Sequence, residues 1–361
     1  MKIFVHLRHG FNAKTWEDRY RKKLVPDLSP YGYHHAKKFG CEITYSTDHE
    51  ETFIKSIFRR SLAKILGFDL IHVKRNLRNM ENADVIWTHT EYEFLAILFF
   101  LRKLKKKEKP KIISQIIWLA DRWNNFSFLK KFMYRSLLKK TDILTFHSLD
   151  NLKFIEKILP EVKKELVLFG ISLDSFPIQR PEISEIRKSI NVLSVGNDIH
   201  RDWSTLLDAL GNKENIKLRI LNRTLSKKLE EKYSNLKIIK PKNLDEIKEN
   251  YKWADLVVVP LKENLHASGI TVILEATTFG KPVVCSKTGG LEVYFSEDDV
   301  YYIPVRNKNL LYKAVIELKE NLDLREKLVK NAQKTLIKKD LTTEGFAKRH
   351  YKISQNLLRK K

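Results

Sequence analysis

With 361 residues the chain is too long for one ordinary core, and it predicts two domains of about 150 to 180 residues each. A hydrophobic content of 43% and an aromatic content of 11% exclude a disordered or low-complexity protein. The net charge of +24 indicates a polyanionic partner, which is a nucleic acid, an anionic membrane surface or a phosphorylated ligand.

Targeting and redox signals point to the cytoplasm. The first apolar run, Lys2 to Leu7, is too short for a signal peptide, and no run reaches the roughly 18 to 20 apolar residues of a membrane span. Cys41 and Cys285 have no metal-binding spacing, which is typical of a reducing compartment. We therefore expect a cytoplasmic protein.

The first strand is predicted at 2–7, and Gly10 follows it where a doubly wound domain has its first loop between strand and helix. A loop rich in Pro, Gly and aromatic residues covers 25–35, and loops of this composition commonly carry ligand contacts. Its candidate contacts are Tyr31, Tyr33, His34 and His35. The alternative is that these rings pack inside an irregular loop.

Further strands of the first half are predicted at 41–45, 69–73, 84–88, 111–119, 142–146 and 165–168. The strand at 84–88 leads to His89, and the strand at 111–119 leads to Asp121. A carboxylate at the carboxyl end of a strand can take the proton from a hydroxyl acceptor as a general base. Asp121 is equally interpretable as a helix cap or as a partner of Arg122.

Two segments combine apolar and basic residues. The segment 93–104 is apolar and runs into basic residues up to Lys111, which indicates either a membrane-surface helix or a buried helix with a solvated basic end. In 126–140 the apolar residues share one helical face, the pattern of a basic amphipathic helix. Together they favour an anionic membrane surface over nucleic acid, for which the sequence has no zinc-finger, RRM or helix-turn-helix signature.

The second half opens with a predicted strand at 191–195, a turn at Gly196-Asn197 and a helix from Asp202. A glycine turn before a helix lets the backbone approach a phosphate. Arg201 lies in this loop, and a guanidinium there can bind a phosphate through paired hydrogen bonds. The alternative is an ordinary surface arginine at a helix start.

The stretch 255–290 predicts a strand, a polar loop, a helix and a second strand. Its loop passes through Ser268 and Gly269 before the helix, and Ile270 and Thr271 begin that helix, where free N–H groups favour phosphate. Glu275 lies one helical turn further on, where a carboxylate can accept hydrogen bonds from ribose hydroxyls. The alternative is a plain helix start with a buried glutamate.

The string from Glu275 to Val283, EATTFGKPV, resembles the donor-site motif E-A-x-x-x-G-x-P-V of the family-4 retaining glycosyltransferases of GT-B fold. The string 169–177 resembles the hinge that closes the first domain in that family. Two positions depart from the pattern. Ala267 stands where the family has a glutamate that contacts the donor sugar, and Asp121 stands where the family often has a histidine.

The resemblance implies an α/β protein of GT-B fold: two doubly wound parallel-sheet (Rossmann-like) domains facing a cleft. It implies an acceptor-side domain at 1–176, a linker at 177–190, a nucleotide-sugar domain at 191–338 and a last helix at 339–361 that crosses back to the first domain. The implied donor-binding residues are Gly196, Asn197, Arg201, His266, Ser268, Gly269, Ile270, Thr271 and Glu275. Ile239 and Lys240 are expected beside the base, and Gly10, Tyr31, Tyr33 and His34 beside the acceptor. The catalytic candidates are Asp121, His89 and Arg201.

The expected function is transfer of a sugar from a UDP- or GDP-linked nucleotide-sugar to a hydroxyl acceptor. The basic segments favour a lipid-linked or other membrane-bound glycan acceptor, as in polysaccharide or glycolipid synthesis, on the inner face of the cytoplasmic membrane. No D-x-D triplet occurs, so we expect no cofactor and no metal. A sugar-nucleotide epimerase of GT-B fold and a non-catalytic sugar-nucleotide or membrane-binding scaffold are the alternatives. A retaining and an inverting outcome both stay open.

Overall fold

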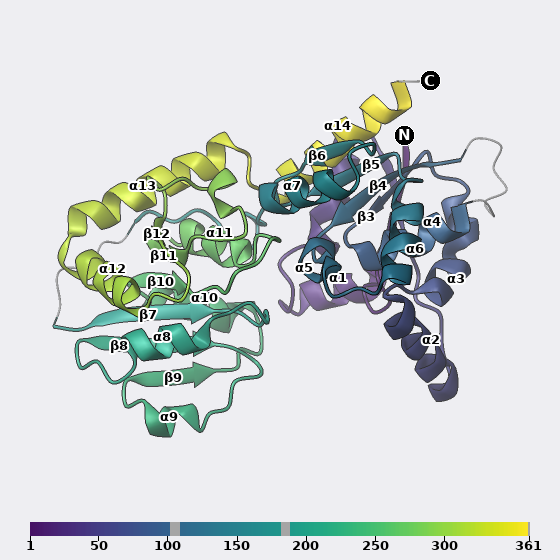
Figure 1. Ribbon diagram of the computed structural model, residues 1–361. Helices are drawn as coiled ribbons and strands as arrows, with labels where there is room; N and C mark the ends of the chain where they lie inside the picture. Colours follow the sequence, from purple (N-terminus) through teal and green to yellow (C-terminus); the bar gives the residue numbers. More distant parts are fainter. Residues whose placement is uncertain (102–108, 182–187, 360–361) are drawn as a thin grey trace. The chain divides into compact units, whose positions relative to one another are not determined.

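The structure of the protein is a computed structural model that describes residues 1–101, 109–181 and 188–359 (Figure 1). The chain divides into two compact units. The N-terminal unit comprises Met1–Arg21, Asp27–Leu168 and Thr343–Lys361, and the C-terminal unit comprises Lys22–Pro26 and Phe169–Thr342. Each unit is built around one six-stranded sheet.

The N-terminal sheet has the strand order β2-β1-β3-β4-β5-β6, and all its pairs are parallel. Its strands are β1 (Lys2–His6), β2 (Glu42–Tyr45), β3 (Val85–Thr88), β4 (Lys111–Ile116), β5 (Ile143–Phe146) and β6 (Lys164–Leu166). The central strands β3 and β5 are wholly buried, as expected of parallel strands covered by helices on both faces. Because β1 has β2 on one side and β3 on the other, the winding direction reverses at β1, where such sheets bind ligands.

Helices of the N-terminal unit connect these strands. They are α1 (Ala13–Arg21), the 3₁₀ segment η1 (Pro30–Phe39), α2 (Phe53–Leu66), α3 (Leu70–Met80), α4 (Glu91–Phe100), α5 (Leu119–Trp123), α6 (Phe128–Leu138), α7 (Leu149–Ile158) and α14 (Thr343–Arg359). The strand predicted at 69–73 is wrong. Asp69 is the N-cap of α3, and its Oδ1 accepts the N–H of His72 at 2.9 Å.

The apolar segment predicted at 93–104 is a core helix where it is described. Eight of the ten residues of α4 are buried, and Phe99 alone among its large apolar side chains is exposed, at 48%. The apolar face of α4 is therefore buried inside the unit and cannot meet a membrane. The basic residues that follow, Arg102 to Lys107, lie outside the described residues.

The last helix completes the N-terminal unit. The indole N–H of Trp87 on β3 donates to Ser354 Oγ of α14 at 2.8 Å in the core. Gly32 of η1 has a φ of +70°, and a Cβ built there would lie 2.4 Å from Thr343 Cβ at the start of α14. This close approach needs glycine both for the backbone angle and for space. The expected return of the last helix to the first half is confirmed.

The C-terminal sheet has the order β12-β11-β10-β7-β8-β9, again with parallel pairs only. Its strands are β7 (Ile190–Val195), β8 (Ile216–Leu221), β9 (Leu236–Ile239), β10 (Leu256–Val259), β11 (Val283–Ser286) and β12 (Tyr301–Ile303). Here β7 lies between β10 and β8, so the reversal of winding places a ligand edge at the ends of β7 and β10. The predicted pair of doubly wound parallel sheets is confirmed.

The helices of the C-terminal unit are α8 (Trp203–Leu210), α9 (Leu229–Lys232), α10 (Leu244–Trp253), α11 (Ile270–Thr278), the 3₁₀ segment η3 (Leu291–Val293), α12 (Lys308–Glu320) and α13 (Leu322–Lys338). The short segment Lys22–Pro26 joins this unit, and Lys23 donates from Nζ to Asp245 at 2.9 Å. Helices α8 and α12 pack against each other, and Leu206, Leu218 and Val315 are buried in one cluster. That packing holds the loops at the carboxyl ends of the strands in place.

Candidate active site

The candidate site of the C-terminal unit lies where β7 and β10 end. Its backbone comes from two loops, 196–202 after β7 and 260–269 after β10. The loops are joined by the antiparallel bridge between Arg201 and Leu261 and by the N–H of Lys262, which donates to His200 O at 2.8 Å. The predicted meeting of the two phosphate-approach loops is therefore seen within one unit.

Arg201 is a buried cation at the centre of this edge, because its exposed fraction is only 5%. Its Nε donates to Val195 O at 3.1 Å, and Nη1 donates to Ser268 Oγ at 2.9 Å. A Cβ on Gly196 would lie 2.1 Å from Arg201 Nε, so the glycine makes room for the guanidinium. Burial lowers the pKa of Arg201 because the charge is removed from water. A bound anion would offset that cost.

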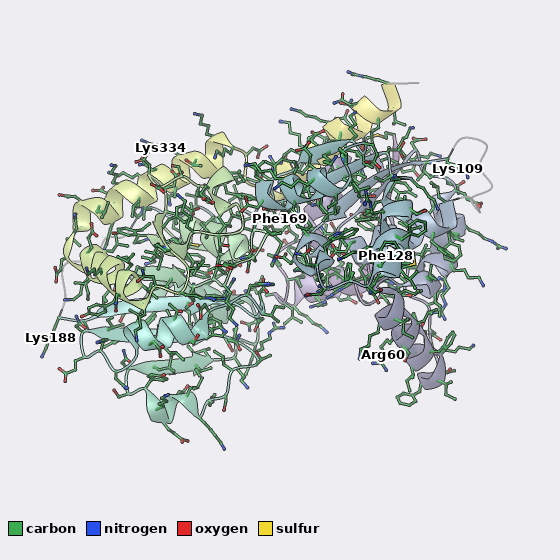
Figure 2. The ribbon with its side chains drawn as sticks, in the orientation of Figure 1. Arg60, Lys109, Phe128, Phe169, Lys188 and Lys334 are labelled. Carbon is green, nitrogen blue, oxygen red and sulfur yellow. The ribbon has the colours of Figure 1, made fainter. Side chains whose placement is uncertain are left out.

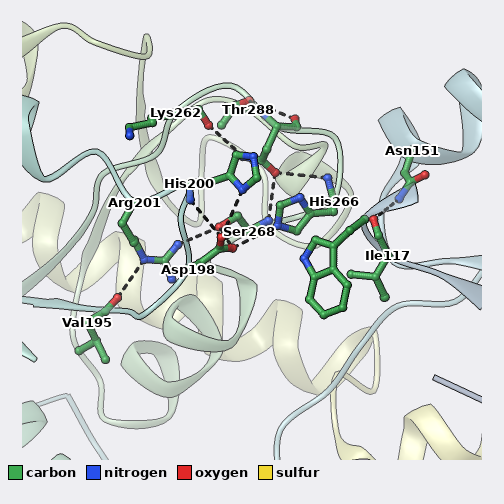
Figure 3. Close-up of polar contacts among 12 residues, drawn as sticks. Ile117, Asn151, Val195, Asp198, His200, Arg201, Lys262, His266, Ser268 and Thr288 are labelled. Atoms are coloured by element: carbon green, nitrogen blue, oxygen red, sulfur yellow. Dashed lines mark hydrogen bonds and ion pairs between the residues drawn. The ribbon is translucent and has the colours of Figure 1, made fainter. Parts of the chain in front are cut away.

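Asp198 gathers the other polar groups of the two loops (Figure 3). It accepts hydrogen bonds from His266 Nε2 at 3.1 Å, from Ser268 Oγ at 2.7 Å and from the N–H of His200 at 3.0 Å. Burial would raise the pKa of Asp198, but these hydrogen bonds lower it well below its usual range. Since an ionised carboxylate only accepts, His266 Nε2 carries a proton in this arrangement.

Ser268 is bonded through its hydroxyl to two side chains of the site. Its hydroxyl accepts from Arg201 and donates to Asp198, so it couples the cation to the carboxylate and has no proton left for a diphosphate. His266 is likewise buried and committed to Asp198. Both residues lie at the site, as expected. Ser268 contacts Arg201 directly, and His266 contributes through Asp198.

The loop before α11 is held rigidly. Asn264 Oδ1 accepts the N–H groups of His266 at 3.3 Å and Ser268 at 3.2 Å, and the N–H of Ala267 donates to Gly289 O at 3.1 Å. Ala267 has a φ of +54°, a left-handed conformation that side chains other than glycine seldom adopt. A buried methyl group thus stands at the position of the family's glutamate.

The start of α11 is an open helix N-terminus. Gly269 is its N-cap, with a φ of +90°, and a Cβ there would lie 2.6 Å from Val259 Cγ1 and 3.4 Å from Arg201 Nη1. Ile270 is buried and Thr271 exposed. The first N–H groups of a helix lack intrahelical acceptors and carry partial positive charge. This N-terminus and Arg201 present two positive groups on one edge.

Glu275 lies half-buried on the next turn of α11. The hydroxyl of Tyr251 on α10 donates to its Oε2 at 2.6 Å, and the Tyr251 ring stacks on Phe279 with centroids 5.2 Å apart. Burial raises the pKa of Glu275 to about 7, against the lowering effects of Tyr251 and Arg201. The carboxyl group is therefore poised between its two protonation states at neutral pH.

The predicted base-side residues lie at the end of β9. Ile239 is partly buried, and its carbonyl accepts the N–H of Asn222 at 3.1 Å, whereas Lys240 is exposed. Asn222 Nδ2 also donates to Gly196 O at 2.6 Å. Exposed Asn197 accepts the N–H of Arg223 at 2.8 Å. Asn222 thus ties this strand end to the glycine turn.

In the N-terminal unit, His89 follows β3 and is buried under an aromatic stack. Its ring lies parallel to that of Tyr31 with centroids 3.2 Å apart, and its Nδ1 is 3.1 Å from the Tyr33 hydroxyl. Burial lowers the pKa of His89 well below its usual value and raises that of Tyr31, so both groups are neutral at pH 7. Tyr33 is completely buried and packs as a core ring.

The remaining acceptor-side candidates are spread over this unit. Gly10, with a φ of +92°, donates its N–H to both oxygens of Asp48 at 3.1 Å. His34 is half-buried at the start of η1 and bonds to Ser29 Oγ through Nδ1 at 3.0 Å, so it belongs to a turn. Asp121 is half-buried inside α5, five residues beyond the end of β4. The strand predicted at 111–119 is therefore too long, because β4 ends at Ile116 and α5 begins at Leu119.

A pocket of about 670 Å³ opens at the carboxyl edge of the N-terminal sheet. It is lined by the loops after β1 and β3, the turn before α5 and residues of α2. The lining residues are Arg8, His9, Gly10, Phe11, Tyr31, Arg59, Arg60, Gly67, Thr90, Glu91, Tyr92, Trp118 and Arg122. Of the predicted acceptor-side residues, Gly10 and Tyr31 line it. We call it the arginine pocket.

Several site residues escaped the sequence analysis. They are Asp198, His200, Tyr251 and Asn264 in the C-terminal unit, and Arg8 and Arg122 in the N-terminal unit. A usable signal existed for Asp198 and Arg8, because both follow a predicted strand directly at the switch in winding. Nothing local marks Tyr251, whose partner Glu275 lies on another helix, or Asn264, which accepts the N–H groups of two later residues of its own loop.

Residues 176–335 match the family model of glycosyl transferases group 1. No curated protein matches the chain. Solved structures match over nearly its whole length: sucrose-phosphate synthase from Thermosynechococcus elongatus (14% identity, 100% of both chains, TM-score 0.75) and Anabaena HepE in complex with UDP-glucose (12% identity, 98% of this chain and 99% of that one, TM-score 0.69). WaaG, a glycosyltransferase involved in lipopolysaccharide biosynthesis, matches at 16% identity, 99% of both chains and a TM-score of 0.59.

These matches fall on the features already described. The family model covers β7 to α13 and therefore contains Arg201, Ser268 and Glu275. The structural matches extend over both sheets, at identities that speak for the fold. The fold implied by the resemblance is confirmed: the chain has the GT-B fold, and its residues 176–335 match the family model of glycosyl transferases group 1.

Proposed function

We propose that the protein transfers a sugar from a nucleotide-sugar, UDP- or GDP-linked, to a hydroxyl acceptor. The observation that carries the proposal is the buried cation Arg201 beside the open N-terminus of α11, inside a glycosyl transferases group 1 domain. Similar structures include Anabaena HepE with UDP-glucose and with UDP and glucose. A nucleoside diphosphate is the leaving group that such a site would hold.

The chemistry at this edge is stabilisation of negative charge. As the bond between the sugar and the diphosphate breaks, charge develops on the phosphate oxygens, and preorganised donors lower the barrier. Arg201 Nη2 has no hydrogen-bond partner among the described residues and can reach an anion while Nη1 and Nε stay fixed. Glu275, held by Tyr251, would accept hydrogen bonds from the ribose hydroxyls.

Proton removal from the acceptor is assigned to the N-terminal unit. His89 and Asp121 remain our candidates, because each lies at the carboxyl edge of the sheet that bears the arginine pocket. His89 is neutral at pH 7 because burial lowers its pKa, and the same burial makes its imidazole a weaker base than a free histidine. We expect the reaction to need no metal, since Arg201 and the helix N-terminus provide positive charge. Full activity after EDTA treatment is the expected result.

A binding panel tests the sugar-donor site. The free energy of unfolding should rise by about 2.7 kcal/mol when a nucleotide is present at 100 times its dissociation constant, which shifts the melting temperature by a few degrees. We expect UDP or GDP, and neither ADP nor CMP, to produce this shift. If none of the four nucleotides changes the melting temperature, the glycosyltransferase proposal fails.

Product analysis separates transfer from the alternatives. A glycosyltransferase releases nucleoside diphosphate faster when an acceptor is added, whereas an epimerase converts the nucleotide-sugar alone. A scaffold binds the nucleotide-sugar without releasing diphosphate, even slowly. Release of diphosphate that depends on the acceptor supports transfer over both.

Two helices of the N-terminal unit support a membrane-linked acceptor. On α2 the exposed apolar side chains Phe53, Ile54, Phe58 and Ile65 have exposed fractions of 75%, 78%, 63% and 74%. On α6, Phe128, Leu129 and Phe132 are 80%, 77% and 68% exposed. The helices meet where the Tyr134 hydroxyl of α6 donates to Leu66 O of α2 at 2.7 Å.

Basic residues accompany these apolar side chains, and Figure 2 labels Arg60 on α2 and Phe128 on α6. Exposed apolar rings inserted among lysines and arginines suit the interface of an anionic bilayer, where each cation contributes about 1 kcal/mol. Among the described helices none is both long and apolar enough to cross a membrane. We propose that the face formed by α2 and α6 docks on an anionic membrane surface, which would be the inner face of the cytoplasmic membrane.

Vesicle sedimentation tests this docking. We expect binding to vesicles containing phosphatidylglycerol, weak binding to neutral phosphatidylcholine vesicles, and weaker binding at high salt. Phe58→Ser together with Phe128→Ser should lower binding at least tenfold, because each buried aromatic side chain contributes about 1.5 to 3 kcal/mol. Ile337→Ser is the matched control, since Ile337 is 65% exposed on α13. Equal loss in the control would contradict docking through α2 and α6.

A further inference from the structure

The arginine pocket has an excess of positive charge. Its lining contains four arginines, Arg8, Arg59, Arg60 and Arg122, against one carboxylate, Glu91. Charged residues of one sign collected in a concave site raise the local concentration of ligands of the opposite sign.

Arg59 is balanced. Its Nε donates to Glu51 at 2.9 Å and its Nη1 donates to Asp69 at 2.6 Å, and all three side chains are buried. Asp69 in turn caps α3, so Arg59 ties the base of α2 to the start of the next helix. Arg59 therefore has a structural role, and its charge is not available to a ligand.

The other three arginines have no ion-pair partner among the described residues, and all three are exposed. Arg8 lies over the ring of Phe11, with Cζ 4.2 Å from its centroid, and Arg122 lies over Trp118 at 5.7 Å. Stacking on a ring holds a guanidinium in place and leaves its N–H donors directed outward for an anion.

The nearby carboxylates do not offset these charges. Glu91 is buried and accepts the N–H groups of Ile117 and Trp118 at 3.1 Å, and burial raises its pKa, which favours its neutral form. Asp48 accepts the N–H of Gly10 with both oxygens. An anion that enters the pocket would therefore meet arginines whose charge these two carboxylates do not neutralise.

We propose that the arginine pocket binds an anionic group, a phosphate or a carboxylate, carried by the sugar acceptor. The inference rests on the proposed glycosyltransferase function and adds the chemical class of the acceptor. Arg8 and Arg122 bind the anionic group through charge-assisted hydrogen bonds, which in bidentate form match both phosphate and carboxylate. Arg60 adds charge at the rim, and the rings of Tyr31, Tyr92 and Trp118 offer apolar faces to a sugar.

Direct binding tests the class of the acceptor. Glucose 6-phosphate, glucuronate and glucose are titrated into the full-length protein by calorimetry, with UDP or GDP saturating the sugar-donor site so that its phosphate loops are filled. We expect the two anionic sugars to bind at least tenfold more tightly than glucose. Arg8→Gln and Arg122→Gln should each weaken the anionic sugars about tenfold, which is the effect of losing one hydrogen bond to a charged group.

Arg78→Gln is the matched control, because Arg78 is exposed on α3 and does not line the pocket. It should bind anionic sugars as the wild type does. Binding that does not depend on the charge of the sugar, or on Arg8 and Arg122, overturns the inference, and so does failure of both anionic sugars to bind. Retained nucleotide binding in those experiments leaves the proposed function intact, whereas loss of nucleotide binding in the wild type removes that function as well.

A lipid headgroup could supply the same anionic chemistry. Sedimentation with phosphatidylglycerol vesicles separates the two sources. If Arg8→Gln and Arg122→Gln abolish vesicle binding without weakening the sugar phosphate, the pocket belongs to a headgroup and the acceptor assignment is wrong. Unchanged vesicle binding together with weakened sugar-phosphate binding supports it.

Discussion

The carboxyl edges of the two sheets balance their charges in different ways. In the C-terminal unit Arg201, Ser268, Asp198 and His266 form one connected chain of hydrogen bonds, so the cation is fixed before any ligand arrives. In the N-terminal unit Arg8 and Arg122 of the pocket stack on rings and have no carboxylate partner among the described residues. A fixed cation suits a leaving group common to many reactions, and an unpartnered one leaves room for a variable acceptor.

Removal of the fixed cation should give the largest effect. Arg201→Met keeps much of the side-chain volume and removes the charge, and we expect kcat to fall about 100- to 1,000-fold, as for the loss of one preorganised donor. Steady-state kinetics and the melting temperature of the variant are the measurements. Arg306→Met, at an exposed arginine of the same unit, should retain full activity. A drop of less than fivefold in Arg201→Met would place the leaving group elsewhere.

Acidification should affect the N-terminal unit first. Burial lowers the pKa of His147 to about 4 and that of His350 to about 3, while an unfolded histidine titrates near 6.5. The unfolded chain then binds more protons, so stability falls as the pH drops below about 6.5, by about 1.4 kcal/mol for each of the two histidines at pH 5.5. Asp198, whose pKa is lowered, loses its contribution only at much lower pH.

Denaturant unfolding at pH 7.5 and pH 5.5, followed by hydrogen exchange of the two units, measures this difference. His350→Phe should reduce the loss of stability between the two pH values by about 1.4 kcal/mol. His49→Gln, at an exposed histidine of the same unit, should leave the loss unchanged. Equal acid sensitivity of both units would show that the buried histidines do not control it.

The carboxyl group of Glu275 should make nucleotide binding depend on pH. Its pKa is raised to about 7, so it is mainly protonated at pH 6 and mainly ionised at pH 8. Ribose hydroxyls donate more strongly to the ionised form, so the affinity for UDP or GDP should rise over this range. Glu275→Gln should bind about tenfold more weakly at pH 8 and show little change with pH, as calorimetry would reveal. Glu320→Gln, on the exposed end of α12, serves as the control.

Loss of the hydroxyl that links Arg201 to Asp198 should have the smallest effect on kcat. Ser268→Ala removes the hydroxyl that joins Arg201 to Asp198 but leaves the other bonds of both groups. We expect kcat to fall about three- to tenfold, which corresponds to about 1 kcal/mol, because Arg201 keeps its hydrogen bond to Val195 O and stays in place. A loss as large as that of Arg201→Met would mean that Ser268 itself contacts the reacting groups.

The sequence predicts the second half of the molecule well because strand, glycine turn and helix follow one another locally. Arg201, Gly269 and Glu275 lie beside predicted turns, and the structure brings their two loops together. The pairing of Asp198 with His266 spans 68 residues, and no local pattern reveals which loops will meet. The bonds of the Ser268 hydroxyl to Arg201 and Asp198 depend on the same meeting of loops.

The first half shows where periodicity misleads. The strand predicted at 69–73 is the start of α3, because Asp69 caps that helix. A short apolar run is compatible with a strand and with a helix. The sequence makes the apolar segment of α4 a candidate for membrane contact, but this helix is buried. The sequence analysis predicts no such contact for α2, yet α2 exposes Phe53 and Ile54. Only tertiary packing decides which of two apolar helices is covered.

The last helix gives the chain an order of assembly during synthesis. Because α14 supplies Ser354 to Trp87 in the core of the N-terminal unit, that unit lacks a part of its interior until Thr343–Arg359 leaves the ribosome. At about 5 to 20 residues per second, the ribosome needs roughly 10 to 40 seconds to pass from the end of β6 to that helix. The C-terminal unit starts later, but its last residue, Thr342, is made before α14 of the N-terminal unit. The strands of the N-terminal unit are therefore exposed to chaperones until α14 is made.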